Sequence, residues 1–448
     1  MSTIILKNGS SKKITNLDSS YKIIDELKNK TISYLVNKGL FIFHSQSNLS
    51  NDLYVLQEIN NEIKTKNIAG FVGIDDERLI IKSKFSDSDS DKDYLTRYLL
   101  QEVLDFPNIV DLQTDAGQEE EIFDLLICAF PIYLKNALRK GPYKTYITKK
   151  YNDLNVSGSI DVKRHITKNI PFTGKIAYNK RELSTDNYLT EIIRHTIEYI
   201  KSKKYGSYIL SNIRNEVIKI NSCTPSYHKR DRFNVILENQ KKPIYHAYYS
   251  EYRELQTLCL LILSSQKHQI GFGPKKMYGI LFDVSWLWEE YINKVISKNF
   301  YHPENKTKKY TQHLLYNHNT KKPVGEIYPD FISKSNNPRI ILEAKYKYRK
   351  DISGDDYKQI LSYMYRFKSY IGYFVYPSTK NEDIIALSLL DGLESLEPNF
   401  CEKFTKTSVY KYGFKIPTDT NTNFEKFEIE MKNEEKALQK EIEKILKK

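Results

Sequence analysis

Two short apolar segments near the C-terminal end carry charged residues that a buried strand does not ordinarily hold. The first contains Tyr328-Pro-Asp330, the second contains Leu342-Glu-Ala-Lys345, and the turn sequence Ser335-Asn-Asn-Pro338 lies between them. We expect residues 326–333 and 339–347 to form a β-hairpin. Because buried strands seldom carry unpaired carboxylate or ammonium groups, this pattern constrains the fold more than any other feature of the chain.

The spacing of these charged residues indicates a particular chemistry. Side chains two apart on a strand share a face, so Glu343 and Lys345 project together, and the hairpin brings Asp330 beside them. Two converging carboxylates repel each other unless a cation lies between them, and hard oxygen ligands favour Mg²⁺, with Mn²⁺ as an alternative. We expect Asp330 and Glu343 to bind this metal. Lys345 would orient the attacking water or neutralise charge on a phosphate, so the predicted reaction is phosphodiester hydrolysis.

Each of these residues also has a purely structural interpretation. Glu343 and Lys345 could form a structural ion pair without a metal. Glu289, within Trp288-Glu-Glu-Tyr291 on a predicted helix, is a candidate supporting residue, but a solvated helix position explains it nearly as well and Glu290 competes for the role. Gln359, on a helix predicted over 354–367, could touch the metal-bound water or the substrate. Asp356 is better explained as an acid favoured by the helix N-terminus.

The length of 448 residues favours several domains rather than one core. We predict an α+β or α/β multidomain protein with a mixed N-terminal region, a helical middle and a C-terminal nuclease-like domain. The predicted ranges are 1–170 for the N-terminal mixed domain, 171–284 for a helical linking region, 285–420 for the catalytic domain and 421–448 for a charged C-terminal helix.

Composition excludes several classes of protein. The net charge of +13 suits a phosphate polymer as partner. Heavy use of Lys, Asn, Ile and Tyr can also follow from an AT-rich genome. The four cysteines are far apart, which argues against a zinc ribbon or a disulfide framework and favours the cytoplasm. No apolar run approaches the roughly 20 residues of a membrane span. The P-loop pattern GxxxxGK[ST] occurs nowhere, so we do not expect the chain to hydrolyse nucleotides itself.

Several motifs together resemble the McrC family, the nuclease subunits of McrBC-type and LlaJI-like restriction systems. The nuclease-end motifs are Pro329-Asp330, Glu343-Ala-Lys345, Asp356-Tyr-Lys-Gln359 followed by Tyr363, and Gly372-Tyr-Phe-Val-Tyr-Pro377. Weaker upstream matches follow in the expected order: Gly73-Ile-Asp, Leu79-Ile-Ile-Lys, Lys140-Gly141, Gly158-Ser-Ile-Asp161 and Asp186-Asn187.

This resemblance implies a C-terminal PD-(D/E)xK fold that cuts double-stranded DNA with Mg²⁺. It also implies an N-terminal part that docks onto an AAA+ GTPase ring of the McrB kind and stimulates its GTPase in a restriction system acting against phage DNA. Two alternatives stay open. The chain could be a stand-alone PD-(D/E)xK nuclease of DNA repair, or a non-cutting adaptor that activates an AAA+ NTPase.

Overall fold

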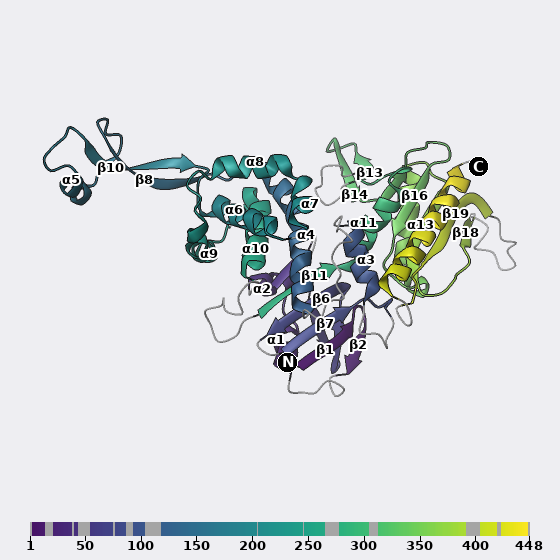
Figure 1. The fold of residues 1–448 in the computed structure, drawn as a ribbon. Helices are drawn as coiled ribbons and strands as arrows, with labels where there is room; N and C mark the ends of the chain where they lie inside the picture. The colour runs from purple at the N-terminus through teal and green to yellow at the C-terminus, as the bar shows by residue number, and fades with distance from the viewer. Residues whose placement is uncertain are drawn as a thin grey trace. The chain divides into compact units, whose positions relative to one another are not determined.

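A computed structural model of the chain describes residues 2–13, 21–37, 40–43, 54–74, 77–86, 93–103, 118–203, 205–244, 246–264, 277–303, 312–390, 404–418 and 423–446. These residues form two compact units. Unit 1 combines residues 1–106 with residues 273–448, and unit 2 consists of residues 107–272. Both units mix helices and strands, which confirms the predicted α+β multidomain class (Figure 1).

The first sheet of unit 1 is assembled from both of its chain segments. Its strand order is β1-β7-β6-β11-β3, with β6 and β7 as an antiparallel hairpin and β11 antiparallel to β6. A strand that follows unit 2 in sequence therefore completes a sheet begun near the N-terminus. The strands are β1 (Ser2–Lys7), β3 (Leu40–Phe43), β6 (Ile68–Ile74), β7 (Glu77–Lys82) and β11 (Met277–Asp283).

Smaller elements accompany this sheet. A three-stranded sheet of order β2-β5-β4 precedes β6 in the chain, and its residues Leu56 and Ile63 share one apolar core with Leu79 and Leu281 of the larger sheet. These elements are α1 (Lys22–Leu27), α2 (Ile32–Asn37), β2 (Ser11–Lys13), β4 (Leu56–Ile59), β5 (Glu62–Thr65) and α3 (Tyr94–Val103).

The second large sheet of unit 1 is mixed and has the order β12-β15-β16-β17-β19-β18. β15 and β16 are antiparallel, whereas β16, β17 and β19 run parallel. The strands are β12 (Phe300–Tyr301), β15 (Phe331–Ser333), β16 (Ile340–Ala344), β17 (Ile371–Ser378), β18 (Ile385–Leu390) and β19 (Phe404–Lys415), and a separate ribbon consists of β13 (Gln312–Asn317) and β14 (Lys322–Ile327).

Three helices cover this mixed sheet. The helix α12 (Gly354–Arg366) connects β16 to β17 and buries Ile360 against Ile341 and Phe374. The helix α11 (Val284–Ile296) packs Trp288 against Phe414 of β19. The helix α13 (Phe424–Leu446) contacts β19, α11 and α3. The predicted hairpin around the turn at 335–338 and the predicted helix over 354–367 are confirmed.

Two sequence expectations for this region are wrong. The apolar run from Tyr370 to Tyr376 predicts a strand that stops before Pro377, but β17 continues through Pro377 up to Ser378. The Ser378 carbonyl accepts a hydrogen bond from Ile416 on the β19 side, so Pro377 faces the other side, where pairing with β16 has already ended at Val375. The missing N–H of proline costs no ladder bond there. The alternating Glu and Lys residues of 423–448 predict a charged helix that forms a coiled coil or a frayed tail. Instead, α13 buries apolar residues in unit 1, among them Phe427, Met431 and Leu438.

Unit 2 consists of packed helices and a small antiparallel sheet. The sheet has the order β8-β10-β9, and Figure 1 shows β8 and β10 extending from the helices as a long hairpin that carries α5. The elements are α4 (Gln118–Leu138), β8 (Thr145–Asp153), β9 (Ser159–Ile160), α5 (Val162–Lys168), β10 (Ile176–Ser184), α6 (Tyr188–Lys201), α7 (Gly206–Ser211), α8 (Arg214–Cys223), η2 (Lys229–Asp231), α9 (Arg232–Lys241), η3 (Ala247–Tyr249) and α10 (Ser250–Ser264).

The N-cap of α6 differs from the expected one. Residue preferences predict Thr185 or Asp186 as the cap. In the structure, Asn187 accepts hydrogen bonds from the backbone N–H groups of Leu189 and Thr190. The Thr190 hydroxyl accepts in return from the Asn187 N–H, which completes a capping box. The conformation of the preceding Ser-Thr-Asp turn decides which side chain can accept from the first N–H groups of the helix. Preferences of single residues do not encode that conformation.

The boundaries of the two compact units differ from those of the four predicted ranges. Residues 277–283, which fall in the predicted helical linking region, form β11 of unit 1. The ranges 1–170, 171–284, 285–420 and 421–448 stay a functional prediction, because compactness alone does not test them. Among the described residues, no helix combines the length and apolar character needed to cross a membrane.

Candidate active site

The hairpin places Asp330 and Glu343 next to each other at one end of the mixed sheet. Phe331 of β15 pairs with Leu342 of β16, so Asp330, one residue before Phe331, lies opposite Glu343. Glu343 has the same strand parity as Ile341, which packs under α12. Alternation along the strand thus turns Glu343 toward α12.

Backbone N–H groups across the hairpin donate to the carboxylates of both Asp330 and Glu343. The Asp330 N–H donates to Glu343 Oε1 over 3.2 Å, and the Ala344 N–H donates to Asp330 Oδ2 over 3.0 Å. Glu343 is only 1% exposed, whereas Asp330 keeps part of its surface exposed. Hydrogen bonds from the backbone therefore fix the positions of the two carboxylates relative to each other.

This proximity perturbs both carboxyl groups. Desolvation raises the pKa of Asp330 well above its ordinary value, and the charge of Glu343 raises it further. Burial also raises the pKa of Glu343, although Lys345 and the Asp330 N–H oppose the effect. A buried carboxylate pair of this kind is costly unless positive charge is nearby, and perturbed groups in such a cluster are typical of functional sites.

Lys345 supplies the positive charge. Its Nζ lies 3.3 Å from Glu343 Oε2 and 3.6 Å from Asp356 Oδ1. Burial alone would lower the pKa of Lys345, but Glu343, Asp330 and Asp356 together raise it above its usual value. The ammonium group consequently stays charged at neutral pH.

Gln359 and Tyr363 on α12 extend this network. Lys345 Nζ donates to Gln359 Oε1 over 2.8 Å, and Gln359 Nε2 donates to the Tyr363 hydroxyl over 2.9 Å. The structure therefore brings Gln359 beside Lys345, whereas its contact with a metal-bound water or the substrate stays a prediction. Asp356 serves the helix as expected, because its Oδ2 accepts from the Ser353 N–H in a capping box, and it also pairs with Lys345.

His302, which no sequence pattern singles out, lies between Glu289 and Asp330. His302 Nδ1 donates to the Asp330 carbonyl over 2.8 Å, and its Nε2 lies 3.7 Å from Glu289 Oε1 and 3.5 Å from Glu290 Oε1. Burial lowers the pKa of His302, but hydrogen bonds with Glu290 and with the Asp330 carbonyl outweigh this and raise it to about 9. No spacing pattern marks His302, because the pairing of Tyr301 with Ile332 brings it there.

The donor set fits a small divalent cation. Among the described residues, no three His, Cys, Asp or Glu side chains converge as a ready-made metal cage. Mg²⁺, however, is commonly bound by one or two carboxylates and retains several water molecules. Glu343 Oε2 is buried and accepts no hydrogen bond, although it is ion-paired with Lys345. An oxygen in this state, beside a second carboxylate, suits a metal ligand.

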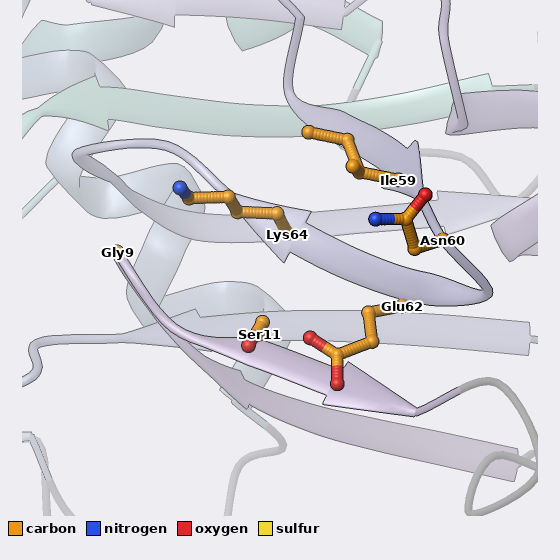
Figure 2. A pocket seen from close by; sticks show the side chains of 6 residues that line it. All are labelled: Gly9, Ser11, Ile59, Asn60, Glu62 and Lys64. Atoms are coloured by element: carbon orange, nitrogen blue, oxygen red, sulfur yellow. The ribbon is translucent and has the colours of Figure 1, made fainter.

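A hollow elsewhere in unit 1 does not share these groups. It lies over the strands β2 and β5 and the turn at Asn60 (Figure 2). Its lining contains one carboxylate and one ammonium group, from Glu62 and Lys64, rather than a pair of carboxylates. The residues that line it are Gly9, Ser11, Ile59, Asn60, Glu62 and Lys64.

The fold and the site define an α+β protein whose mixed sheet gathers two carboxylates and a charged lysine at one point, a set of groups suited to metal-assisted phosphate chemistry. The chain belongs to the McrBC 5-methylcytosine restriction system component family, whose family model matches residues 63–377. The resemblance to the McrC family drawn from the sequence motifs is thereby confirmed.

Two solved structures are similar to the chain. One is a refined half-complex from a tetradecameric assembly of Thermococcus gammatolerans McrB AAA+ hexamers with bound McrC, at 18% identity, covering 98% of this chain and 100% of that chain, with a TM-score of 0.45. Another is a cryo-EM structure of the Thermococcus gammatolerans McrBC complex, at 18% identity, covering 66% of this chain and 88% of that chain, with a TM-score of 0.29. No curated protein matches the sequence. The family assignment rests on the family model.

Proposed function

We propose that the chain is the Mg²⁺-dependent endonuclease subunit of a GTP-driven, McrBC-like restriction complex and that it cuts double-stranded DNA. The observation that carries this proposal is the convergence of Asp330, Glu343 and Lys345 on one end of the mixed sheet. In this proposal the region 285–420 is a PD-(D/E)xK domain. The order of a hairpin, a crossover helix and a parallel strand in β15-β16-α12-β17 supports that assignment.

Each residue has a role that follows from its contacts. Asp330 and Glu343 would hold the metal, which when bound supplies Lewis acidity toward a phosphate oxygen and a more acidic water. Lys345, held charged between Glu343 and Gln359, would orient that water or offset negative charge on the phosphate. Gln359 positions the Lys345 ammonium group. His302 fixes the Asp330 carbonyl, with Glu289 and Glu290 behind it.

The proposed partner is an AAA+ GTPase ring of the McrB kind, whose GTPase the chain would stimulate. Family membership supports it, and the sequence itself has no P-loop. The chain would thus contribute the cutting site while another subunit hydrolyses GTP. The completeness of the carboxylate and lysine set disfavours a non-cutting adaptor, since an adaptor needs none of these buried charges.

Reconstitution tests the proposal. The chain is combined with its AAA+ partner on methylated and unmethylated DNA, with Mg²⁺ and with or without GTP. Asp330→Asn and Lys345→Met should each lower cleavage by at least 100-fold while complex assembly and GTPase stimulation persist. Asp355→Asn is the matched control, because this acid lies at the start of α12 with its side chain 91% exposed.

The outcomes separate the three candidate functions. Undiminished cutting by both variants would exclude the proposed site. Equal cutting by the chain alone, without partner or GTP, would favour a stand-alone nuclease. GTPase stimulation by a wild-type chain that never cuts DNA would favour the adaptor.

A further inference from the structure

The segment that follows β16 is held from one side by Asp356. Lys345 Nζ lies 3.6 Å from Asp356 Oδ1, and Lys347 Nζ lies 2.8 Å from Asp356 Oδ2. These two lysines are two residues apart and reach the same carboxylate at the start of α12. The proposed catalytic lysine is thus part of a segment whose odd-numbered side chains face α12.

The intervening tyrosines contact a different part of unit 1. The Tyr346 hydroxyl is 2.6 Å from Ser83 Oγ, and its ring meets the ring of Phe85 edge-on, with centroids 5.1 Å apart. The Tyr348 hydroxyl donates to the Lys84 carbonyl over 3.0 Å. Ser83, Lys84 and Phe85 directly follow β7 of the five-stranded sheet. The segment is therefore clamped between α12 and residues more than 260 positions earlier in the chain.

Lys84 makes the central contact of this clamp. Its Nζ donates to the Tyr346 carbonyl over 3.0 Å. The same ammonium lies 5.0 Å from the ring centroid of Tyr346, 5.4 Å from that of Tyr348 and 5.5 Å from that of Phe85. Three aromatic rings and one carbonyl thus replace much of the water around this charge. A cation so enclosed is fixed in position, unlike an ordinary surface lysine.

Hydrogen bonds also hold the backbone of Ser83 and Lys84 in place. The Ser83 N–H donates to Asp93 Oδ2 over 2.8 Å, and the Lys84 N–H donates to Asn8 Oδ1 over 2.9 Å. Asn8 directly follows β1, and Asp93 directly precedes α3. The position of Lys84 is therefore tied to the end of β1, to the end of β7 and to the residue that precedes α3.

The carbonyl that Lys84 holds belongs to a tight turn at the candidate site. The Lys345 N–H donates to the Val375 carbonyl as the last bond of the ladder, and the Lys347 N–H donates back to the Lys345 carbonyl over 2.9 Å. Tyr346 is the middle residue of this three-residue turn. Rotation of the Tyr346 carbonyl would rotate the Tyr346–Lys347 peptide, whose N–H donates to the Lys345 carbonyl, and so would disturb the turn by which the chain leaves β16.

We propose that Lys84 is a positioning residue for Lys345, acting through the Tyr346 carbonyl, so that the N-terminal sheet controls the geometry of the cutting site. This inference rests on the proposed nuclease function for its kinetic consequence. A shift of β1 and β7 relative to the mixed sheet would pull on the turn and move the Lys345 ammonium away from Glu343. Through this link, movement of the five-stranded sheet would switch cleavage on or off.

Two substitutions at one position test the proposal in the full-length chain. Lys84→Met keeps the aliphatic stem inside the aromatic rings and removes the donor, whereas Lys84→Arg keeps a charged donor. With the partner GTPase present, Lys84→Met should lower kcat for DNA cleavage by about 10-fold with KM for DNA unchanged. Lys84→Arg should recover a substantial part of the loss. Lys30→Met is the matched control, because Lys30 also lies over a tyrosine ring, that of Tyr34, without touching residues 345–348.

Hydrogen exchange of the chain alone gives a readout independent of cutting. Lys84→Met should speed exchange in peptides that cover residues 343–348 and leave β1 and β7 unchanged. If the wild-type chain never cuts but this local change occurs, the proposed function falls and the link stands. Wild-type kcat in Lys84→Met, no recovery in Lys84→Arg, unchanged exchange at 343–348, or faster exchange throughout the five-stranded sheet would each overturn the positioning role.

Discussion

The Asp330 N–H donates to the carboxylate of Glu343 across the β15–β16 pair, while the carboxylate of Asp330 accepts from the Ala344 N–H. These two hydrogen bonds hold the acids together although burial and the charge of Glu343 raise the pKa of Asp330, and burial raises the pKa of Glu343. The repulsion is tolerated because Lys345 lies beside Glu343. A bound divalent cation would relieve it further, and this has a measurable consequence for stability.

Mg²⁺ should stabilise the folded chain through Asp330 and Glu343. A ligand that binds only the folded state adds about 2.7 kcal/mol at a 100-fold excess over its Kd. We expect Tm to rise by several degrees between EDTA and saturating Mg²⁺ in the wild type, and expect no rise in Asp330→Asn. Asp355→Asn, altered at an exposed acid nearby, should keep the full shift. An equal Mg²⁺ shift in Asp330→Asn would show that the metal binds elsewhere.

Gln359→Leu should slow cleavage without weakening DNA binding. The substitution keeps most of the side-chain volume but removes the acceptor for Lys345 Nζ and the donor to Tyr363. Loss of one hydrogen bond to a charged group is worth about 1.5 kcal/mol, so kcat should fall about 10-fold. Steady-state cleavage assays measure it. Lys358→Gln, on the exposed side of the same helix, is the control and should cut at the wild-type rate.

His302→Ala should impair cleavage more than His302→Asn. The alanine removes the donor to the Asp330 carbonyl and the ring that packs on Phe331, whereas asparagine keeps an N–H donor near the position of Nδ1. We expect a loss of roughly 10-fold for alanine, the value of one well-placed hydrogen bond to a charged donor, and a smaller loss for asparagine. Equal rates in the two variants would mean that this hydrogen bond does not position Asp330.

Local periodicity and turn chemistry were enough to predict the parts of the site that lie on one hairpin and the following helix. Asp330, Glu343, Lys345 and Gln359 are joined by strand alternation, by a turn and by helical spacing, all readable over short stretches. His302 was missed because its place depends on the pairing of β12 with β15, and a two-residue strand carries almost no sequence signal.

Contacts between residues that are far apart in the sequence could not be predicted for the same reason. Strand β11 looks like any short apolar segment, and only its pairing with β6 and β3 assigns it to a sheet more than 200 residues earlier. Lys84 likewise has no motif, and its link to Tyr346 exists only after both sheets have formed. Local residue preferences describe neither kind of contact.

Gly70→Ala should destabilise the five-stranded sheet strongly. Gly70 has φ +135°, and a Cβ there would lie 2.2 Å from the carbonyl oxygen of Ile280 on the adjacent strand β11. Backbone strain and overpacking together should cost about 2–4 kcal/mol of unfolding free energy, measured by denaturant titration. Gly354→Ala is the control, because a Cβ at this helix start meets nothing within 4 Å. Equal stability of the two variants would contradict the close approach of β6 and β11.

Glu254→Gln should stabilise unit 2 above neutral pH and have little effect in acid. Burial on α10 raises the pKa of Glu254 from 4.5 to about 7, with a smaller contribution from Glu251. Between these two values the unfolded chain releases the proton while the folded chain retains it, so the unfolding free energy falls as pH rises from about 4.5 to 7. Glutamine cannot ionise and removes this loss.

Urea denaturation of the wild type and Glu254→Gln at pH 4.5 and pH 8, followed by a probe in unit 2, checks this sign. The two proteins should have nearly equal unfolding free energies at pH 4.5. At pH 8 the variant should be the more stable one, because folding of the wild type then requires either burial of a charged carboxylate or protonation of Glu254 above its pKa. The control is Asp231→Asn, an acid on the exposed surface of unit 2, which should show no comparable gain between the two pH values. A variant that is less stable than the wild type at pH 8 would mean that the Glu254 carboxylate is solvated or paired in the folded chain.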